Sequence, residues 1–365
     1  MTYEYYMKMA IELSKKGEGF TNPNPLVGAV IVKDDKILGV GYHKKYGENH
    51  AEINAFLDAT EKGNDVKNAS IYVTLEPCSH YGKTPPCVDS IIENKLSKVI
   101  IGCVDPNVKV NGIKKLKDAG IEVIINVLEE ECKKLNEVFF YYIVNKRPYI
   151  VMKYAMTMDG KIATYSGKSK WITSKKSREH SHKFRNKYSA IMVGINTVIE
   201  DNPVLNCRLE NTRDPIRIIL DSNLKIDLNS NICKTSKEIK TFIASVIINK
   251  DKEKKLNDFG IEVIKTKSNN GKVDLNELFK ILGEEKNIDS IYVEGGSNLH
   301  ASLLEQKLVN KVLIYIAPKI FGGANAKTPI GGIGIENTND AIKLVNGNFE
   351  NIDNDSFFEY YLEYK

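Results

Sequence analysis

The 365-residue sequence has no run of about eighteen apolar residues, the length at which a membrane-spanning helix is expected. Residues 1–16 have the pattern of an amphipathic helix and lack the basic flank and apolar centre of a secretory leader. Six cysteines in a chain of this length do not resemble a secreted disulfide framework, so we expect reduced thiols or metal ligands. These absences predict a cytoplasmic protein with no membrane partner.

Charge of one sign is not concentrated in the chain either. The net charge is +5, and the lysines are scattered rather than clustered. Binding of nucleic acid normally needs a basic patch with aromatic side chains that stack on bases, so we expect no nucleic-acid partner. The sequence also lacks a G-x-G-x-x-G fingerprint, and a Rossmann domain is therefore not supported.

The length and composition favour two globular domains. The chain is more than twice as long as a typical domain, and its hydrophobic content of 42% and charged content of 27% are close to globular averages. Around Asn145-Lys146-Arg147-Pro148 a helical pattern stops at a proline, and a new strand pattern follows. We therefore predict domains at residues 1–145 and 146–365.

Strand and helix signals alternate in both halves. Apolar runs at 27–32 and 37–42 around a polar turn predict a hairpin, and a helix is expected from Leu128 to Phe139. The first half is thus predicted to be a layered α/β/α domain. The second half is predicted to be another α/β domain with its own sheet, and its Lys/Asn/Ile-rich stretch 223–290 is interpreted as compositional rather than functional. Its predicted strands lie at 149–155, 189–194, 216–221, 239–248, 261–265, 289–294, 311–317 and 356–364, with helices near 174–187, 274–284 and 297–306.

A zinc deaminase motif lies in the first half. His50 opens a predicted helix, Cys78 follows a proline after a strand, and Cys87 ends a compact loop. One imidazole and two thiolates suit tetrahedral zinc with an open position for water, whose pKa zinc lowers so that it becomes a hydroxide nucleophile. Glu52 is not needed as a ligand and can move the proton from this water to the departing amine. Taken alone, a His-Ala-Glu helix start is usually a surface turn; the combination with both cysteines favours zinc.

The segment between the cysteines narrows the class of deaminase. It carries His80, Lys83 and Thr84, groups that can hold a phosphate or a sugar, and a polar turn at 22–29 precedes the hairpin. With its Thr-Asn-Pro-Asn-Pro, His-Ala-Glu and Pro-Cys…Gly-Lys-Thr-Pro-Pro-Cys elements, this half resembles the diaminohydroxyphosphoribosylaminopyrimidine deaminase of riboflavin biosynthesis. The resemblance implies a cytidine-deaminase-like fold, Glu52 as the catalytic residue, and substrate contacts from Asn24, His43, His80 and Lys83.

The stretch Asp105–Gly112 resembles an Asp-Pro-Asn-Pro-Lys-Val segment of the same family, with Val108 in place of its second proline. Asp105 or Asn107 at the end of a strand can contact the base. Both residues are equally common as turn formers, so their role is left open.

The second half carries weaker signals that are informative only together. A Met-Asp-Gly turn ends the strand that contains Lys153, and the single tryptophan lies in a Trp-Ile-Thr segment where packing is as good an explanation as binding. Asp201-Asn202-Pro203 precedes Arg208, whose guanidinium suits a phosphate. Glu294-Gly295-Gly296 opens a helix whose backbone N–H groups can approach a phosphate.

In this order the elements resemble the reductase half of the same bifunctional enzymes, which has a dihydrofolate-reductase-like fold and uses NADPH. The resemblance implies that Lys153 polarises the reacting centre and that the arginines of the substrate site take its 5′-phosphate. The implied substrate contacts are Ser169, Arg185, Leu205, Arg208 and Glu294. The implied NADPH contacts are Ala155, Trp171, Thr173, Thr197, Asp201, Gly296, Ser297, Asn298, Leu299, His300, Ala301 and Ser302.

The resemblance covers nearly the whole chain and implies two successive reactions on a phosphorylated pyrimidine. Zinc-dependent deamination of 2,5-diamino-6-ribosylamino-4(3H)-pyrimidinone 5′-phosphate would precede NADPH reduction of the ribosyl group of 5-amino-6-(5-phosphoribosylamino)uracil to ribityl. We also expect a homo-oligomer. Two alternatives remain: a nucleic-acid editing protein that shares the zinc core, and a deaminase whose second half has become a binding or structural module.

Overall fold

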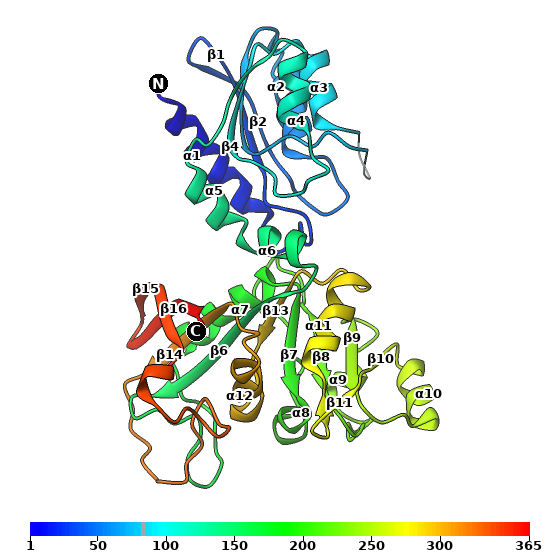
Figure 1. Cartoon of the computed structure of the whole chain (residues 1–365), viewed down its shortest axis with the longest axis vertical. Helices are drawn as coiled ribbons and strands as arrows, with labels where there is room; N and C mark the ends of the chain where they lie inside the picture. Colours follow the sequence, from blue (N-terminus) through cyan, green and yellow to red (C-terminus); the bar gives the residue numbers. More distant parts are fainter. Residues whose placement is uncertain (82–84) are drawn as a thin grey trace. The chain divides into compact units, whose positions relative to one another are not determined.

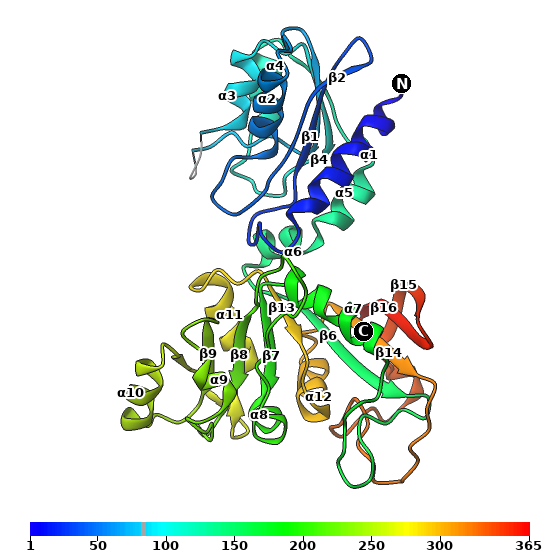
Figure 2. The same cartoon turned by 180° about the vertical axis from the view of Figure 1, so that it is seen from behind.

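The computed structural model describes residues 1–81 and 85–365, and the chain divides into two compact units, Met1–Lys146 and Arg147–Lys365. Each unit is described by itself (Figures 1 and 2). Among the described residues, no helix combines the length and the apolar character that crossing a membrane requires.

The N-terminal unit is a three-layer α/β/α domain around a five-stranded sheet of order β2-β1-β3-β4-β5. Strands β1 and β2 form the antiparallel hairpin that the sequence predicts, and β3, β4 and β5 run parallel. The unit contains α1 (Tyr3–Ser14), η1 (Lys15–Gly17), β1 (Gly28–Lys33), β2 (Lys36–Tyr42), α2 (Ala51–Glu61), β3 (Ser70–Leu75), α3 (Cys87–Glu93), β4 (Lys98–Cys103), α4 (Gly112–Asp118), β5 (Glu122–Ile124), α5 (Glu129–Leu135) and α6 (Glu137–Asn145).

Helices cover both faces of this sheet. Helices α1 and α5 lie on one face, and α2, α3 and α4 lie on the other (Figure 1). Tyr6, Met7, Ala10 and Ile11 recur at helical spacing, so α1 presents one continuous apolar face, which is buried. The amphipathic helix predicted at the start of the chain is therefore confirmed.

The single helix predicted from Leu128 to Phe139 is wrong, because the structure forms α5 and α6 with a break at Asn136. The buried Asn136 side chain accepts a hydrogen bond from Leu26 N at 2.8 Å and donates one to Leu26 O at 2.9 Å. This contact satisfies two backbone groups of the turn that carries Asn24.

The C-terminal unit is built on a nine-stranded sheet of order β10-β9-β8-β7-β13-β6-β14-β16-β15. The first seven strands in this order, from β10 through β14, are parallel to one another. Strand β16 is antiparallel to both of its neighbours, β14 and β15. Its elements are β6 (Tyr149–Thr157), α7 (Lys175–Lys187), β7 (Ala190–Gly194), α8 (Ile195–Asp201), β8 (Ile216–Leu220), α9 (Asn231–Lys234), β9 (Thr241–Ser245), α10 (Lys250–Asp258), β10 (Glu262–Lys265), β11 (Ser268–Asn269), β12 (Lys272–Val273), α11 (Leu275–Glu284), β13 (Ser290–Val293), α12 (Ser297–Glu305), β14 (Lys311–Ala317), η2 (Thr338–Asp340), β15 (Lys343–Ile352) and β16 (Asp355–Glu363).

Alternate residues of the central parallel strands feed two apolar cores. Met192 and Ile218 pack toward the core shared with α11 and α12, whereas Ile191 and Ile219 pack toward the core shared with α8, α9 and α10. The predicted strands and helices of this half are present. Helices α8, α9 and α10, the hairpin β11–β12 and strand β15 were not predicted, because they bury few apolar residues and give little periodicity.

Candidate active sites

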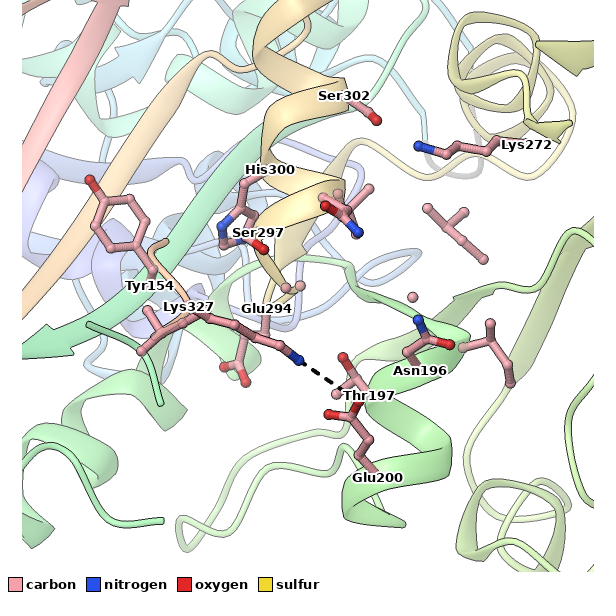
Figure 3. A pocket seen from close by; sticks show the side chains of 18 of the residues that line it. Tyr154, Asn196, Thr197, Glu200, Lys272, Glu294, Ser297, His300, Ser302 and Lys327 are labelled. Atoms are coloured by element: carbon pink, nitrogen blue, oxygen red, sulfur yellow. Dashed lines mark ion pairs between the residues drawn. The ribbon is translucent and has the colours of Figure 1, made fainter. Parts of the chain in front are cut away.

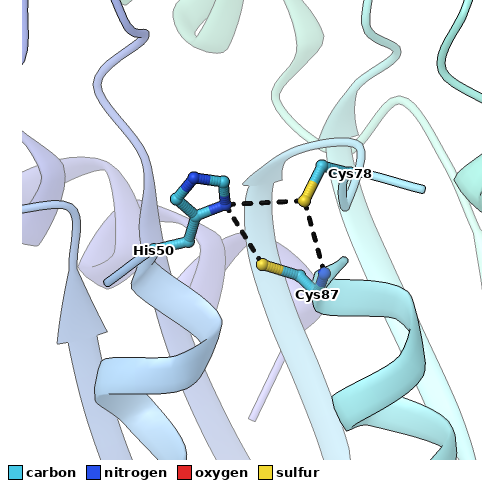
Figure 4. Close-up of side chains that lie close together, drawn as sticks. All are labelled: His50, Cys78 and Cys87. Carbon is cyan, nitrogen blue, oxygen red and sulfur yellow. Dashed lines mark hydrogen bonds between the residues drawn. The ribbon is translucent and has the colours of Figure 1, made fainter. Parts of the chain in front are cut away.

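His50, Cys78 and Cys87 come together in the N-terminal unit (Figure 4). His50 immediately precedes α2, Cys87 is the first residue of α3, and Cys78 follows β3. The His50 Nδ1 atom lies 3.2 Å from Cys87 Sγ and 3.5 Å from Cys78 Sγ. Tetrahedral zinc with bonds of about 2.0–2.3 Å separates its donors by about 3.5–3.8 Å. The three side chains therefore fit a zinc ion with little movement.

The electrostatics of Cys78 favour metal binding, whereas the hydrogen bond of Cys87 with Cys78, together with burial, raises the pKa of the Cys87 thiol. A hydrogen bond from Cys87 lowers the pKa of the Cys78 thiol to about 4. Thiolate is the form that binds zinc, so one ligand is already in its binding state near neutral pH. Cys87 N also donates to Cys78 Sγ at 3.3 Å, which holds that sulfur in place.

We expect Cys78→Ser or Cys87→Ser to lose zinc and deaminase activity, because a hydroxyl is a poor replacement for a thiolate ligand. Metal analysis of the purified variants tests this, with Cys233→Ser as the control because Cys233 is buried in the other unit. Full zinc content together with full activity would show that the changed cysteine is not a ligand.

Glu52 lies in the first turn of α2 and is only 3% exposed. Burial, reinforced by the charge of Cys78, raises the pKa of its carboxyl above the usual value. A carboxyl group whose pKa moves toward neutrality is suited to take up and release a proton at working pH. Glu52 shares its cavity with His50 and Cys78.

The cavity lined by His50, Glu52 and Cys78, called the deaminase cavity below, has a volume of about 330 Å³. It brings together most of the residues predicted for the deaminase site. Lys83, predicted as a substrate contact, lies outside the described residues. Glu76, Phe139 and Ile143 also line the cavity and were not predicted as site residues. The predicted residues that line it are Asn24, His43, His50, Glu52, Cys78, His80, Asp105 and Asn107.

The tautomer of His43 is set by its neighbours. The Asn24 amide nitrogen, which can only donate, lies 3.2 Å from His43 Nε2, and His43 Nδ1 lies 3.0 Å from Asn49 O. Nε2 therefore accepts, and Nδ1 carries the proton. Burial lowers the pKa of His43, which keeps the ring neutral. Asn24 is thus held with its amide oxygen available to a ligand.

Asp105, whose role the sequence leaves open, also lines the deaminase cavity. Burial raises the pKa of Asp105 to about 6. The Glu76 carboxylate accepts from the backbone N–H groups of Ile113 at 3.0 Å and Asp105 at 3.4 Å, so it holds the loop that presents Asp105. Glu76 immediately precedes the Pro-Cys motif. Its position beside this motif was the sequence signal that could have identified Glu76 as a residue of the site.

A second cavity, of about 840 Å³, lies in the C-terminal unit (Figure 3). Glu294 directly follows β13. Its carboxylate accepts hydrogen bonds from Arg185 Nη2 at 2.7 Å and from Arg185 Nε at 3.2 Å. Burial alone would raise the pKa of the Glu294 carboxyl, but the positive charges of Arg185 and Lys153 together lower this pKa to about 2. Lys153 lies on β6, its Nζ 5.6 Å from the Tyr315 ring centre, and burial lowers its pKa.

His300 supplies a buried acceptor without a partner. Its ring is 1% exposed, and Nδ1 lies 2.9 Å from the Pro329 carbonyl oxygen, which fixes the proton on Nδ1. Among the described side chains, Nε2 is the buried atom that lacks a hydrogen-bond partner. Burial lowers the pKa of His300 to about 4, so the ring stays neutral. An orphaned acceptor on a cavity wall costs free energy unless a ligand donates to it.

Two glycines make room along the same wall. At Gly194 and Gly296 an added Cβ would meet no atom within 4 Å, and both glycines line the cavity. Gly296 directly precedes α12, whose first N–H groups are therefore accessible to an anion. These features fit a dinucleotide with a pyrophosphate group.

The reductase residues predicted from the sequence divide into two groups. Arg185 donates hydrogen bonds to the Glu294 carboxylate and to Asn206 O, each at 2.7 Å. Arg208 is exposed, and its Nη2 atom lies 3.0 Å from His182 Nε2. Trp171, Thr173, Arg185, Leu205, Arg208 and Ala301 do not appear among the cavity-lining residues. The predicted residues that do line the cavity are Lys153, Ala155, Ser169, Thr197, Asp201, Glu294, Gly296, Ser297, Asn298, Leu299, His300 and Ser302.

Two features of this cavity were not predicted. Ser222 and the hairpin β11–β12 contribute to its lining, although both lie next to or within the stretch interpreted as compositional. Lys327, from the loop after β14, lies 4.0 Å from Glu200 of α8, as the dashed line in Figure 3 shows. Neither feature forms a contiguous motif.

Comparison with known proteins shows the family to which each half of the chain is similar. Residues 1–103 match the cytidine and deoxycytidylate deaminase zinc-binding region, and residues 148–358 match the RibD C-terminal domain. The riboflavin biosynthesis protein RibD of Actinobacillus pleuropneumoniae is 50% identical over 362 residues, covering 99% of this chain and 95% of that protein. The chain belongs to the RibD family.

Solved structures of the RibD family are similar to this chain over nearly its whole length. RibD of Acinetobacter baumannii superposes with a TM-score of 0.89 at 33% identity, covering 99% of both chains. The diaminohydroxyphosphoribosylaminopyrimidine deaminase/5-amino-6-(5-phosphoribosylamino)uracil reductase of Thermotoga maritima superposes with a TM-score of 0.85 at 39% identity, again covering 99% of both chains. The chain is thus a bifunctional riboflavin-biosynthesis enzyme with a zinc-binding deaminase domain and a reductase domain.

Proposed function

We propose that residues 1–145 deaminate the diaminopyrimidine ribosylamino phosphate and that residues 146–365 reduce the ribosyl group of the deaminated product with NADPH. The observation that carries the proposal is the cluster of His50, Cys78 and Cys87, because His50 and Cys78 line the same cavity as the buried carboxyl of Glu52. The family comparisons support the second activity.

In the deaminase cavity, His50, Cys78 and Cys87 would hold a zinc ion, which would lower the pKa of a bound water so that the water could attack the amidine carbon of the ring. Glu52 accepts the proton of this water and passes it to the departing amine. Asn24 and Asp105 offer acceptor oxygens to ring and amino N–H groups, and His80 contacts the sugar or phosphate. The proposal therefore gives Asp105 a contact with the base; that it lines the cavity supports this role over that of a turn former.

In the reductase cavity, bound NADPH would supply the hydride that reduces the ribosyl carbon. We place the reacting carbon beside Lys153 and Glu294, with the pyrophosphate at the start of α12. The orphaned His300 Nε2 accepts from a cofactor amide or hydroxyl group. Arg208 binds the substrate phosphate, whereas Arg185 positions Glu294 through its two hydrogen bonds.

The proposal also covers location and assembly. A small phosphorylated pyrimidine is the partner in both reactions, and we place the enzyme in the cytoplasm. The edge strand β15 exposes Leu344 and Phe349, which is compatible with the homo-oligomer expected from the resemblance.

Incubating the purified chain with the diaminopyrimidine phosphate tests the two reactions in order. Without NADPH we expect a product one mass unit heavier, because an amino group is replaced by oxygen and the ring takes the lactam form. With NADPH we expect a further gain of two hydrogens. An unchanged mass with zinc-loaded protein would refute the deaminase assignment, and a product that stops at the deaminated compound would refute the reductase assignment.

Fragments test the assignment of each activity to one half. A fragment ending at Asn145 is expected to bind zinc and deaminate, and one starting at Lys146 is expected to bind NADPH, because each contact-defined unit contains its own sheet and core. Circular dichroism establishes folding first. A folded C-terminal fragment without NADPH affinity would contradict the assignment.

A further inference from the structure

The hairpin β11–β12 carries a lysine to the reductase cavity. Lys272 lines the cavity together with Asn269, Asn270 and Ser222. Ser222 follows β8, and its Oγ accepts a hydrogen bond from Val273 N at 3.1 Å, which fixes the hairpin to that end of the sheet. The Ser222 hydroxyl therefore keeps its own hydrogen for a ligand.

The sheet order places this end of the cavity away from the reacting centre. Strand β7 separates β8 from β13, which Glu294 directly follows, and Lys153 lies on β6 beyond β13. With neighbouring strands about 4.8 Å apart, the offset from β8 is about 10 Å to β13 and about 14 Å to β6. A dinucleotide that reacts beside Lys153 and crosses the start of α12 therefore directs its adenosine toward Ser222 and Lys272.

Lys272 has no charged partner among the described residues. In the part of the chain that the structure describes, its ammonium group makes no ion pair or hydrogen bond, and its side chain is exposed (Figure 3). The other lining lysines are placed differently: Lys153 lies beside Glu294, and Lys327 pairs with Glu200. The acids of the lining also have other neighbours, since Glu200 pairs with Lys327, Asp201 with Lys170 and Glu294 with Arg185, while Glu305 lies against Gly332.

We propose that Lys272 and Ser222 bind the phosphate monoester on the adenosine ribose of NADPH and thereby make the reductase prefer NADPH to NADH. The two cofactors differ only in this group, which proteins recognise with a nearby cation. A lysine ammonium is a compact charge that binds phosphate well, and a serine hydroxyl adds a donor. The proposal rests on the NADPH-dependent reduction proposed above and assigns its cofactor specificity to this hairpin.

Calorimetric titration of the full-length Lys272→Met variant with NADPH and with NADH tests the proposal. The affinity for NADPH is expected to fall about 10- to 100-fold, the loss typical of one charged hydrogen-bonding partner, while the affinity for NADH stays within about twofold. Adenosine 2′,5′-bisphosphate is expected to lose affinity in parallel with NADPH. Lys272→Arg is expected to restore most of the preference.

Lys265→Met is the matched control, because Lys265 is an exposed lysine of β10 that does not line the cavity. Wild-type protein that binds neither dinucleotide would overturn the reductase assignment and this proposal together. Wild-type protein that binds NADPH, combined with a Lys272→Met variant that weakens both dinucleotides equally or neither, would overturn the Lys272 assignment alone.

Discussion

Replacing Glu52 with glutamine is expected to lower the rate of deamination at least about 100-fold while the zinc content stays at the wild-type level. Glutamine has the same shape but cannot accept the proton from the attacking water or deliver it to the departing amine. The triad of His50, Cys78 and Cys87 does not include the Glu52 side chain, so the metal is expected to remain. Deaminase assays and metal analysis on the same preparation measure both quantities.

Glu48→Gln provides the control for this variant. Glu48 lines the same cavity but is exposed, whereas Glu52 is buried in the first turn of α2. Loss of a carboxylate from the cavity wall should therefore have little effect on the rate. The reductase activity of Glu52→Gln should match that of the wild type, because the residues proposed for the reductase site belong to the other unit. An empty metal site in Glu52→Gln would show that this carboxylate is needed for zinc rather than for proton transfer.

The candidate zinc site could be predicted because its residues are tied to local sequence signals. His50 and Glu52 lie two residues apart at the start of α2, and Cys78 and Cys87 flank one loop between β3 and α3. Spacing along the chain therefore reflects spacing in the structure. The contact between Asn136 and Leu26 has no such signal, because it joins two segments 110 residues apart through one side chain.

The reductase cavity was less predictable because its walls come from the ends of many strands. Glu294 and the start of α12 form a contiguous segment that a motif can describe, and His300 was included in it. Lys272 and Ser222 were missed because the hairpin β11–β12 has only two residues in each strand and no apolar pattern. The sequence also does not distinguish Arg185, which holds Glu294, from Arg208, which is exposed. That distinction depends on which arginine a buried carboxylate meets in the folded chain.

Replacing Lys153 with methionine is expected to lower kcat of the reductase step about 100-fold or more and to leave the affinity for NADPH within about twofold. The Lys153 side chain is half-buried on the cavity wall near Glu294, where the reduced dielectric strengthens the attraction of its ammonium group for negative charge. As hydride reaches the anomeric carbon, the bond from that carbon to the ring oxygen breaks and negative charge develops on this oxygen, so the lysine stabilises the transition state more than the ground state. Methionine preserves the length and packing of the side chain without the charge. Single-turnover kinetics and calorimetry separate the two effects.

A stability measurement distinguishes this catalytic role from a structural one. Burial lowers the pKa of Lys153, so between the folded and unfolded pKa values the unfolded chain binds more protons, and stability rises with pH in that window. Removing the ammonium group removes this cost at neutral pH, while Glu294 keeps its hydrogen bonds from Arg185. Lys153→Met is therefore expected to unfold at a temperature no lower than wild type. The control Lys161→Met, in the turn after β6, should keep full activity. A Lys153 variant that loses both stability and NADPH affinity would assign the lysine to the fold of the cavity instead.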